Sequence, residues 1–176
     1  RDAGASLMHP HSQIVSFNLI PAEIVKEIKI ARSHMDHHNS NLYDYIIESE
    51  LAHQKRVVYD GKCFLVFIPH ATRYNGEIRI ICKDDKKIDQ WGLDEIEEIS
   101  YIYKRLFEKW EDYNVEQIAF NVVIHTYPLN GDYDDLFRTH FHIIPRKFNF
   151  GGFELSTDLF VCGTDPEDLA EFLRFD

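Results

Sequence analysis

Two histidines lie two residues apart near the start of the chain, within the segment of residues 4–13. If this segment is extended, His9, His11 and Gln13 point to the same side, because side chains alternate along a strand. Pro10 fixes one backbone angle between the two imidazoles and presents them stiffly. Three nitrogen-rich groups on one side form a plausible place to hold a phosphate.

His11 is the best candidate nucleophile in this segment. A nucleophilic histidine needs a phosphorus atom within reach, donors for the phosphoryl oxygens and a neighbour that orients its ring. His9 and Gln13 flank it, and Ser6 and the backbone of Gly4 could donate to phosphoryl oxygens. Gln13 is neutral and could steady a nucleotidyl-histidine without helping water attack it, which favours transfer over hydrolysis. From the spacing alone, a surface turn without chemistry is an equal alternative.

A second group of histidines lies in the C-terminal half. His140 and His142 alternate along a predicted strand over residues 137–147 and share one face. His125 ends a predicted strand over residues 119–127, and a hairpin would place it beside them. Three imidazoles suit zinc or iron, and a carboxylate would complete a tetrahedral set. The alternative is a set of core or cleft histidines with ordinary hydrogen bonds.

The composition limits the partners that the chain can have. A net charge of -11 argues against nucleic acid or an anionic membrane surface. The three cysteines are odd in number and widely spaced, which indicates reduced thiols in a cytoplasmic protein. We see no signal peptide and no apolar segment long enough to span a membrane. A length of 176 residues, 44% of them hydrophobic, suits one ordinary domain with a real core.

Hydrophobic periodicity predicts both helices and strands along the chain. The longest predicted helix carries the acidic run Asp94-Glu95-Glu97-Glu98, which we interpret as a solvated face that matches the helix dipole. Asp60-Gly61 is a strong hairpin signal. The predicted helices cover residues 21–35, 42–51, 93–110 and 165–173, and the predicted strands cover residues 14–20, 56–59, 63–68, 77–83, 119–127 and 137–147.

The sequence Gly-Ala-Ser-Leu-Met-His-Pro-His-Ser-Gln, beginning at Gly4, closely resembles the active-site motif of galactose-1-phosphate uridylyltransferases. This family is a transferase branch of the histidine-triad (HIT) superfamily, and the match continues along most of the chain. The resemblance implies that His11 forms a uridylyl-enzyme and that Gln13 contacts this intermediate. It also implies that Gly4 and Ser6 line the phosphate site.

The same resemblance implies two metal sites. His9 would be a zinc ligand, and in the family the other ligands of that site lie upstream of the residues present here. A second, structural metal, zinc or iron, would be held by Glu27, His125, His140 and His142. Four protein ligands leave no open position, so this metal would not activate water for hydrolysis.

Residues 146–155 resemble a Lys-aromatic-Gly-aromatic-Glu segment that contacts the sugar of the nucleotide sugar in the family, often across a dimer interface. The resemblance implies that Glu154 accepts hexose hydroxyls, that Phe153 packs on the sugar ring and that the protein is a homodimer. Ser156-Thr157-Asp158 replaces the Gly-Thr-Gly that is common in relatives. The alternative interpretation of residues 146–155 is a plain glycine-rich turn.

The resemblance therefore implies a HIT-like α+β fold, in which residues 1–40 end a first HIT-like half and residues 41–176 form a second repeat. The implied activity is uridylyl transfer between UDP-glucose and a hexose 1-phosphate through a uridylyl-histidine. A nucleotide-sugar phosphorylase of the ADP-glucose type or an adenylyltransferase is an alternative within the family. An inactive, metal-stabilised binding module is an alternative of another class.

Overall fold

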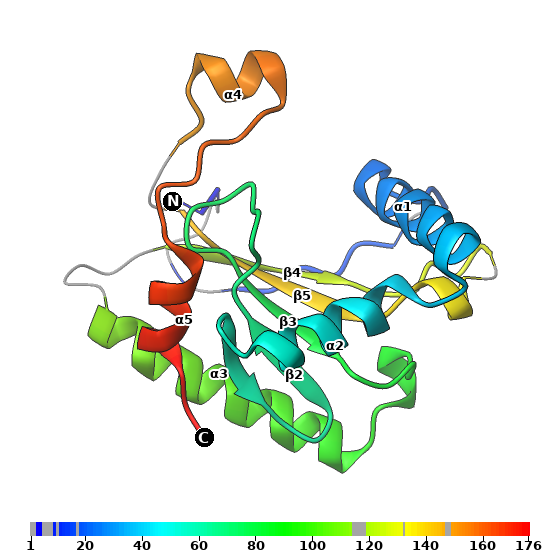
Figure 1. The fold of residues 1–176 in the computed structure, drawn as a ribbon, viewed down its shortest axis with the longest axis horizontal. Helices are drawn as coiled ribbons and strands as arrows, with labels where there is room; N and C mark the ends of the chain where they lie inside the picture. Colours follow the sequence, from blue (N-terminus) through cyan, green and yellow to red (C-terminus); the bar gives the residue numbers. More distant parts are fainter. Residues whose placement is uncertain are drawn as a thin grey trace.

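The fold is organised around a five-stranded antiparallel sheet in the strand order β1-β2-β3-β5-β4 (Figure 1). The computed structural model describes residues 3, 4, 9, 11–16, 18–113, 119–131, 133–146 and 149–176. The strands are β1 (Val57–Asp60), β2 (Phe64–Phe67), β3 (Ile78–Cys82), β4 (Phe120–His125) and β5 (His140–Pro145). Five of the six predicted strands are confirmed within a few residues. Asp60 and Gly61 begin the turn between β1 and β2 as predicted, and Gly61 N donates to the carbonyl of Phe64.

One face of the sheet packs on two helices, α3 (Leu93–Tyr113) and α5 (Pro166–Leu173). Because side chains alternate along each strand, the residues on this face are every second one. From the sheet they are Phe64, Val66, Ile80, Phe141 and Ile143, and from the helices Ile102, Leu106, Trp110, Leu169 and Leu173. Removing these groups from water is the main source of the fold's stability.

The opposite face packs on α1 (Ala22–His38) and α2 (Leu42–His53). Ile24, Ile28 and Ala31 from α1 and Tyr43 and Ile47 from α2 form one cluster with Leu65, Phe67 and Ile81 of the sheet. Along β5 and β4 this face becomes polar, because His140 and His142 alternate on it opposite His125. The α1 helix therefore lies over the part of the sheet where the candidate metal ligands occur.

The helix ends follow their capping chemistry. The side chain of Asn41 accepts from the N–H groups of Tyr43 and Asp44 at the start of α2. Asp165 caps α5 in the same way, with Pro166 in the first turn as predicted. The α1 helix runs three residues further than predicted, to His38, and is capped by Asn39, which adopts a left-handed conformation.

The acidic run at the start of α3 is only partly a solvated face, which corrects our prediction. Glu95 is 3% exposed, accepts a hydrogen bond from Gly92 N and pairs with Lys86. The carboxylate of Glu98 accepts from the N–H groups of Cys63 and Phe64. These two carboxylates satisfy backbone donors at a helix start and at a strand start, which explains why they turn inward.

Two further predictions about local structure are wrong. Residues 11–16 form no strand, and Ile14 and Val15 are 99% and 71% exposed. Apolar alternation alone does not make a strand, because the backbone must also pair with a neighbour. The glycine-rich segment contains a short helix, α4 (Gly152–Thr157), which stands away from the sheet (Figure 1). Glycine has a low helix propensity, so propensity did not predict this helix.

The described residues include no helix that is both long and apolar enough to cross a bilayer. The 3-10 helices Ile88–Gln90 and Asp134–Leu136 complete the described elements. The division into two halves at residue 40 stays a prediction.

Candidate active site and metal centre

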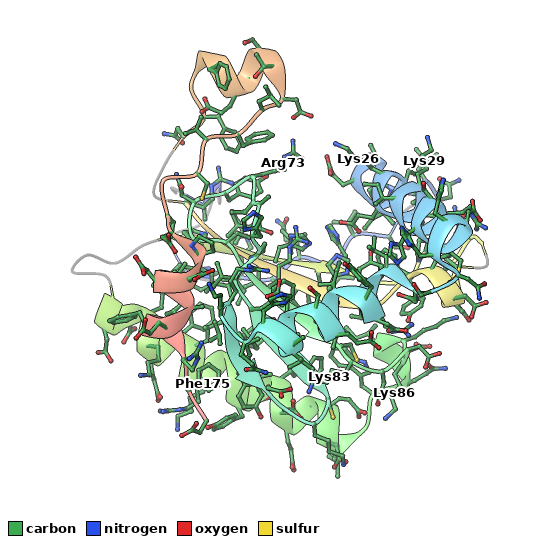
Figure 2. The ribbon with its side chains drawn as sticks, viewed as in Figure 1. Lys26, Lys29, Arg73, Lys83, Lys86 and Phe175 are labelled. Atoms are coloured by element: carbon green, nitrogen blue, oxygen red, sulfur yellow. The ribbon has the colours of Figure 1, made fainter. Side chains whose placement is uncertain are left out.

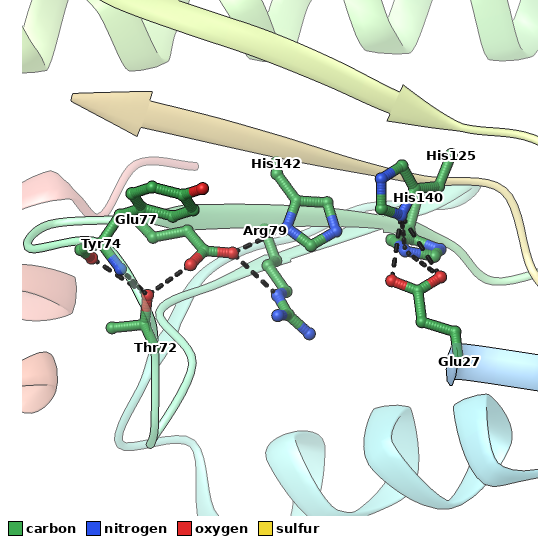
Figure 3. A network of polar contacts seen from close by, with 8 residues as sticks. All are labelled: Glu27, Thr72, Tyr74, Glu77, Arg79, His125, His140 and His142. Atoms are coloured by element: carbon green, nitrogen blue, oxygen red, sulfur yellow. Dashed lines mark hydrogen bonds and ion pairs between the residues drawn. The ribbon is translucent and has the colours of Figure 1, made fainter. Parts of the chain in front are cut away.

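Four metal-ligating side chains converge on the polar part of the α1 face of the sheet. They are Glu27, His125, His140 and His142, and one ligand atom from each lies within 4.8 Å of the others. The sheet register brings the histidines together, because His125 pairs directly with His140 across β4 and β5, and His142 follows two residues later. Glu27 reaches them from α1 (Figure 3). It is the set that the sequence and the family resemblance predicted.

Hydrogen bonds donated by Nδ1 orient the rings of His140 and His142. His140 Nδ1 lies 2.8 Å from the carbonyl of Arg138 and donates to it. His142 Nδ1 lies 2.7 Å from Oε1 of Glu77 and donates to this carboxylate. Each bond fixes the tautomer, so that the Nε2 atom of each neutral ring presents a lone pair.

The distances between the ligand atoms fit a four-coordinate metal. His125 Nδ1 lies 3.0 Å from Glu27 Oε1 and 3.2 Å from His140 Nε2, and His140 Nε2 lies 3.5 Å from Glu27 Oε2. Metal–ligand bonds of about 2.0–2.1 Å in a tetrahedron place neighbouring ligand atoms roughly 3.4 Å apart. The observed separations therefore leave room for one ion of this kind.

An unsatisfied atom supports the same conclusion. Among the described residues, the buried His142 Nε2 has no hydrogen-bond partner, although buried nitrogens almost always have one. A cation held beside the Glu27 carboxylate would satisfy this buried lone pair. The residues present thus fit a zinc or iron ion, and the donor set of three imidazoles and one carboxylate is common to both.

The carboxylate of Glu77 lies next to the cluster and orients His142. It is 2% exposed, and besides His142 it contacts Arg79 Nε at 3.2 Å and the hydroxyl of Thr72 (Figure 3). Burial alone would raise its pKa, but the bonds from His142 and Thr72 and the charge of Arg79 lower the pKa to about 2. Glu77 is therefore ionised and holds the Nδ1 proton of His142.

Glu27 is ionised for a similar reason. Its partial burial opposes the charged form, but the hydrogen bond from His125 Nδ1 and the adjacent ring of His140 outweigh burial and hold the pKa of the carboxyl well below its usual range. An anionic oxygen is the form that binds a metal ion.

The nucleophile segment lies apart from this cluster in the sequence and is exposed. The rings of His9 and His11 lie 6.1 Å apart and meet edge to face. His11 Nδ1 lies 3.2 Å from the carbonyl of His9, and donation there leaves a lone pair on Nε2. Gln13 is exposed, and Gly4 has a φ of +82° with open space around it. Ser6 lies outside the described residues.

The candidate sugar-binding residues lie on α4. Phe153 is 53% exposed, and one carboxylate oxygen of Glu154 accepts from Gly151 N at 2.9 Å. Glu154 thus closes the first turn of its own helix, and its other oxygen is left for further contacts. His9 is not a member of the four-residue cluster.

Comparison with known proteins shows which proteins this chain is similar to. The chain is 28% identical over 141 residues to a galactose-1-phosphate uridylyltransferase from Saccharomyces cerevisiae, a match that covers 80% of this chain. It is 27% identical over 176 residues to an ADP-glucose phosphorylase from Arabidopsis thaliana, which covers 98% of this chain. A solved uridylyltransferase structure superposes with a TM-score of 0.85 and 25% identity over 97% of the chain. The chain is related to the galactose-1-phosphate uridylyltransferases.

The chain spans only part of the length of each of these relatives. The chain spans 38% of the Saccharomyces protein, 48% of the Arabidopsis phosphorylase and 55% of the solved uridylyltransferase. A zinc-bound histidine-triad family protein from Mycobacterium smegmatis shares the fold with a TM-score of 0.50 and 16% identity, covering 77% of this chain and 91% of that one. The fold is therefore α+β and HIT-like, as expected. No family model matches the sequence.

Sequence reasoning missed one residue of this uridylyltransferase-like site, Glu77. The signal available was a single carboxylate directly before the apolar strand β3, which is also consistent with a surface position. Only the pairing of Arg79 on β3 with His142 on β5 shows that Glu77, two residues before Arg79, lies beside His142 on the same face of the sheet.

Proposed function

We propose that this chain is part of a nucleotidyltransferase that acts through a nucleotidyl-histidine at His11. The observation that carries the proposal is the match of 80% to 99% of the chain to galactose-1-phosphate uridylyltransferases from several organisms. The exposed His11, with Nδ1 engaged by its own backbone neighbour, is consistent with attack through Nε2.

The chemistry runs in two displacements. His11 Nε2 attacks the α-phosphorus of UDP-glucose, an N–P bond forms, and the bond from phosphorus to the bridging oxygen breaks to release glucose 1-phosphate. A phosphate oxygen of hexose 1-phosphate then attacks the uridylyl phosphorus, and the N–P bond breaks to restore His11. Because a sugar phosphate is a good leaving group, the first step needs no strong general acid.

The neighbouring residues orient the phosphates and the sugar in this proposal. Gly4 and Ser6 donate to phosphoryl oxygens, and Gln13 contacts the intermediate without activating water. Glu154 accepts hexose hydroxyls and Phe153 packs on the sugar ring, in a homodimer. We place the protein in the cytoplasm, with residues 1–40 and 41–176 in two HIT-like halves.

The cluster of Glu27, His125, His140 and His142 holds a structural metal ion, zinc or iron, in the proposed enzyme. Support comes from the converging lone pairs and from the unpartnered Nε2 of His142. The ion would tie α1 to strands β4 and β5, because its ligands come from these three elements. His9 is the proposed ligand of a separate zinc ion.

A specific observation favours a second candidate, a nucleotide-sugar phosphorylase. The Arabidopsis relative that is named an ADP-glucose phosphorylase matches 98% of this chain at 27% identity, comparable with the 99% and 25% of the uridylyltransferase from Thermotoga maritima. A phosphorylase would form an adenylyl-histidine and use inorganic phosphate as the acceptor. Both candidates require the same nucleophile.

Isotope exchange in the natural polypeptide that contains this chain tests the proposal. With UDP-glucose and labelled glucose 1-phosphate, the wild-type protein and a His37→Ala control, altered at an exposed position of α1, should exchange label. His11→Ala should abolish exchange. Exchange with ADP-glucose alone would replace the main candidate by the phosphorylase. Absence of exchange with either nucleotide sugar would leave the inactive module and refute both enzymes.

A further inference from the structure

Residues 149–163 form an arm that leaves β5, carries α4 and returns to α5. The rings of Phe150 and Phe160, one on each leg of the arm, meet at 4.9 Å. Many of its apolar side chains face solvent, including Leu155 at 75% and Val161 at 67% exposure. An arm with so little burial of its own depends on the contacts at its base to keep one orientation.

The loop between β2 and β3 makes these basal contacts. The ring of Tyr74 lies 5.5 Å from that of Phe150, and Gly163 N donates to Asn75 Oδ1 at 2.6 Å. Arg73, in the same loop, contacts the returning leg of the arm. Its guanidinium carbon lies 4.6 Å from the ring centre of Phe160.

Arg73 also joins the arm to a third element. One terminal nitrogen donates to Asp158 Oδ1 at 3.0 Å, at the end of α4, and the other donates to Glu23 Oε1 at 2.9 Å, at the start of α1. Figure 2 shows Arg73 between the arm and the N-terminal end of α1. A planar fork can serve two carboxylates and a ring at once, which a lysine cannot.

The ion pair with Glu23 connects Arg73 to the helix that also supplies a residue of the metal cluster. Glu23 and Glu27 lie one helical turn apart on α1, so they share one side of the helix. Glu27 belongs to the metal cluster, whereas Glu23 holds Arg73. Within the loop, Thr72 contacts Glu77, which holds His142 (Figure 3). Arg73 therefore contacts the same side of α1 that carries the cluster residue Glu27.

We propose that Arg73 is a positioning residue for the sugar end of the substrate, because its guanidinium, on the β2–β3 loop, links the arm to the start of α1. The assignment of Phe153 and Glu154 to the sugar rests on the proposed function. The two carboxylates are more than half exposed, so each ion pair alone is weak. Loss of Arg73 removes both pairs and the ring contact together.

Hydrogen–deuterium exchange of the arm tests this role without substrate. Arg73→Ala should speed exchange in peptides covering residues 149–163 by roughly 5-fold to 30-fold, with α3 unchanged. Arg73→Lys should give an intermediate rate, because it keeps the charge without the fork. The matched control is Arg105→Ala on α3, because Arg105 has the same 39% side-chain exposure as Arg73 and one carboxylate partner.

A second variant and a second probe keep the test decisive if Arg73→Ala unfolds. Asp158→Asn removes only the arm-side pair and should speed exchange of the arm roughly twofold to fivefold. Cys162 is the one exposed cysteine, since Cys63 and Cys82 are buried, so a nitroxide attached there reports the mobility of the returning leg. Arm exchange in Asp158→Asn and Arg73→Ala equal to that in Arg105→Ala would overturn the proposal.

Kinetics separate positioning from a merely structural role. In the natural polypeptide, Arg73→Ala should raise the UDP-glucose concentration for half-maximal labelling of His11 about tenfold, with the maximal rate unchanged. Arg73→Lys should partly rescue this value. An unchanged half-maximal concentration would contradict a role in positioning the sugar end. If even the wild-type protein forms no adduct, the proposed function fails while the exchange result on the arm still stands.

Discussion

Glu77 Oε1 lies 2.7 Å from His142 Nδ1, and this bond directs the opposite nitrogen of the ring toward Glu27, His125 and His140. The carboxylate is buried and comes from the residue before β3, whereas the ring comes from β5. The pairing of β3 with β5 thus builds both the metal ligand and the group that orients it. This relationship leads to the first three predictions.

The four-residue cluster should bind one divalent transition-metal ion per chain. Metal analysis and X-ray absorption should report three nitrogen ligands and one carboxylate, and His140→Ala should lose the ion whereas His37→Ala should keep it. Metal at 100 to 1,000 times its dissociation constant stabilises the folded chain by about 3 to 4 kcal/mol. Its removal by a chelator should therefore lower the Tm by roughly 6 to 16 °C. A Tm unchanged by chelation would show that the cluster holds no structural ion.

Replacing Glu77 by Gln should weaken metal binding by about 10-fold to 100-fold without removing a ligand. The amide cannot supply the negative charge that holds the Nδ1 proton of His142, so the lone pair on Nε2 becomes a weaker ligand. Competition with a calibrated chelator measures the affinity. Glu108→Gln, an exposed substitution on α3, is the control. Equal metal affinities for the two variants would show that Glu77 does not support metal binding.

The metal-free chain should lose stability as the pH falls. Burial lowers the pKa of His142 below its ordinary value of 6.5 despite its bond to Glu77, and Glu77 has a pKa of about 2 against an ordinary 4.5. Below about pH 6.5 the unfolded chain binds a proton at His142 that the folded chain does not, and below about 4.5 the same holds for Glu77. Both contributions are complete above pH 7 and decline on acidification. Urea midpoints with chelator present should decrease from pH 7 to pH 4, less steeply in His142→Gln, and a flat profile would contradict the assignment.

Gln13→His should shift the fate of the nucleotidyl-histidine from transfer toward hydrolysis. An imidazole beside His11 can act as a general acid or base for water, whereas the amide of Gln13 cannot. The gain in hydrolysis should be up to roughly 10²-fold, the lower range of general acid–base catalysis. The measured quantity is the ratio of free nucleotide to transferred nucleotide in a coupled assay. An unchanged ratio would show that Gln13 does not govern this choice.

The pairing of the three histidines and most of the core could be predicted from the sequence patterns. His140 and His142 alternate on one strand, and period 3.6 in α1 and α3 selected the helix faces that are buried. These patterns are local, so they survive folding. The place of Glu27 in the cluster required the family resemblance, since residues 27 and 125 are brought together only by tertiary packing.

The errors also have physical causes. Residues 14–20 carry apolar side chains with a loose alternation, but the described part of this segment makes no strand pairing, so Ile14 stays exposed. Glu95 and Glu98 were assigned to solvent because helix-dipole arguments apply to exposed charges, whereas they bond to backbone donors that only the folded chain presents. Arg73 gave no local signal, because its partners Glu23 and Asp158 lie 50 and 85 residues away.

The central claim is that His11 carries the nucleotide during transfer. The most direct measurement is mass spectrometry of peptides from the natural polypeptide that contains this chain, after incubation with UDP-glucose and, separately, with ADP-glucose. We predict an acid-labile uridylyl group on the peptide that contains His11, and no such group in the His11→Ala variant. An adduct on another residue, or no adduct with either nucleotide sugar in a protein that binds them, would contradict it.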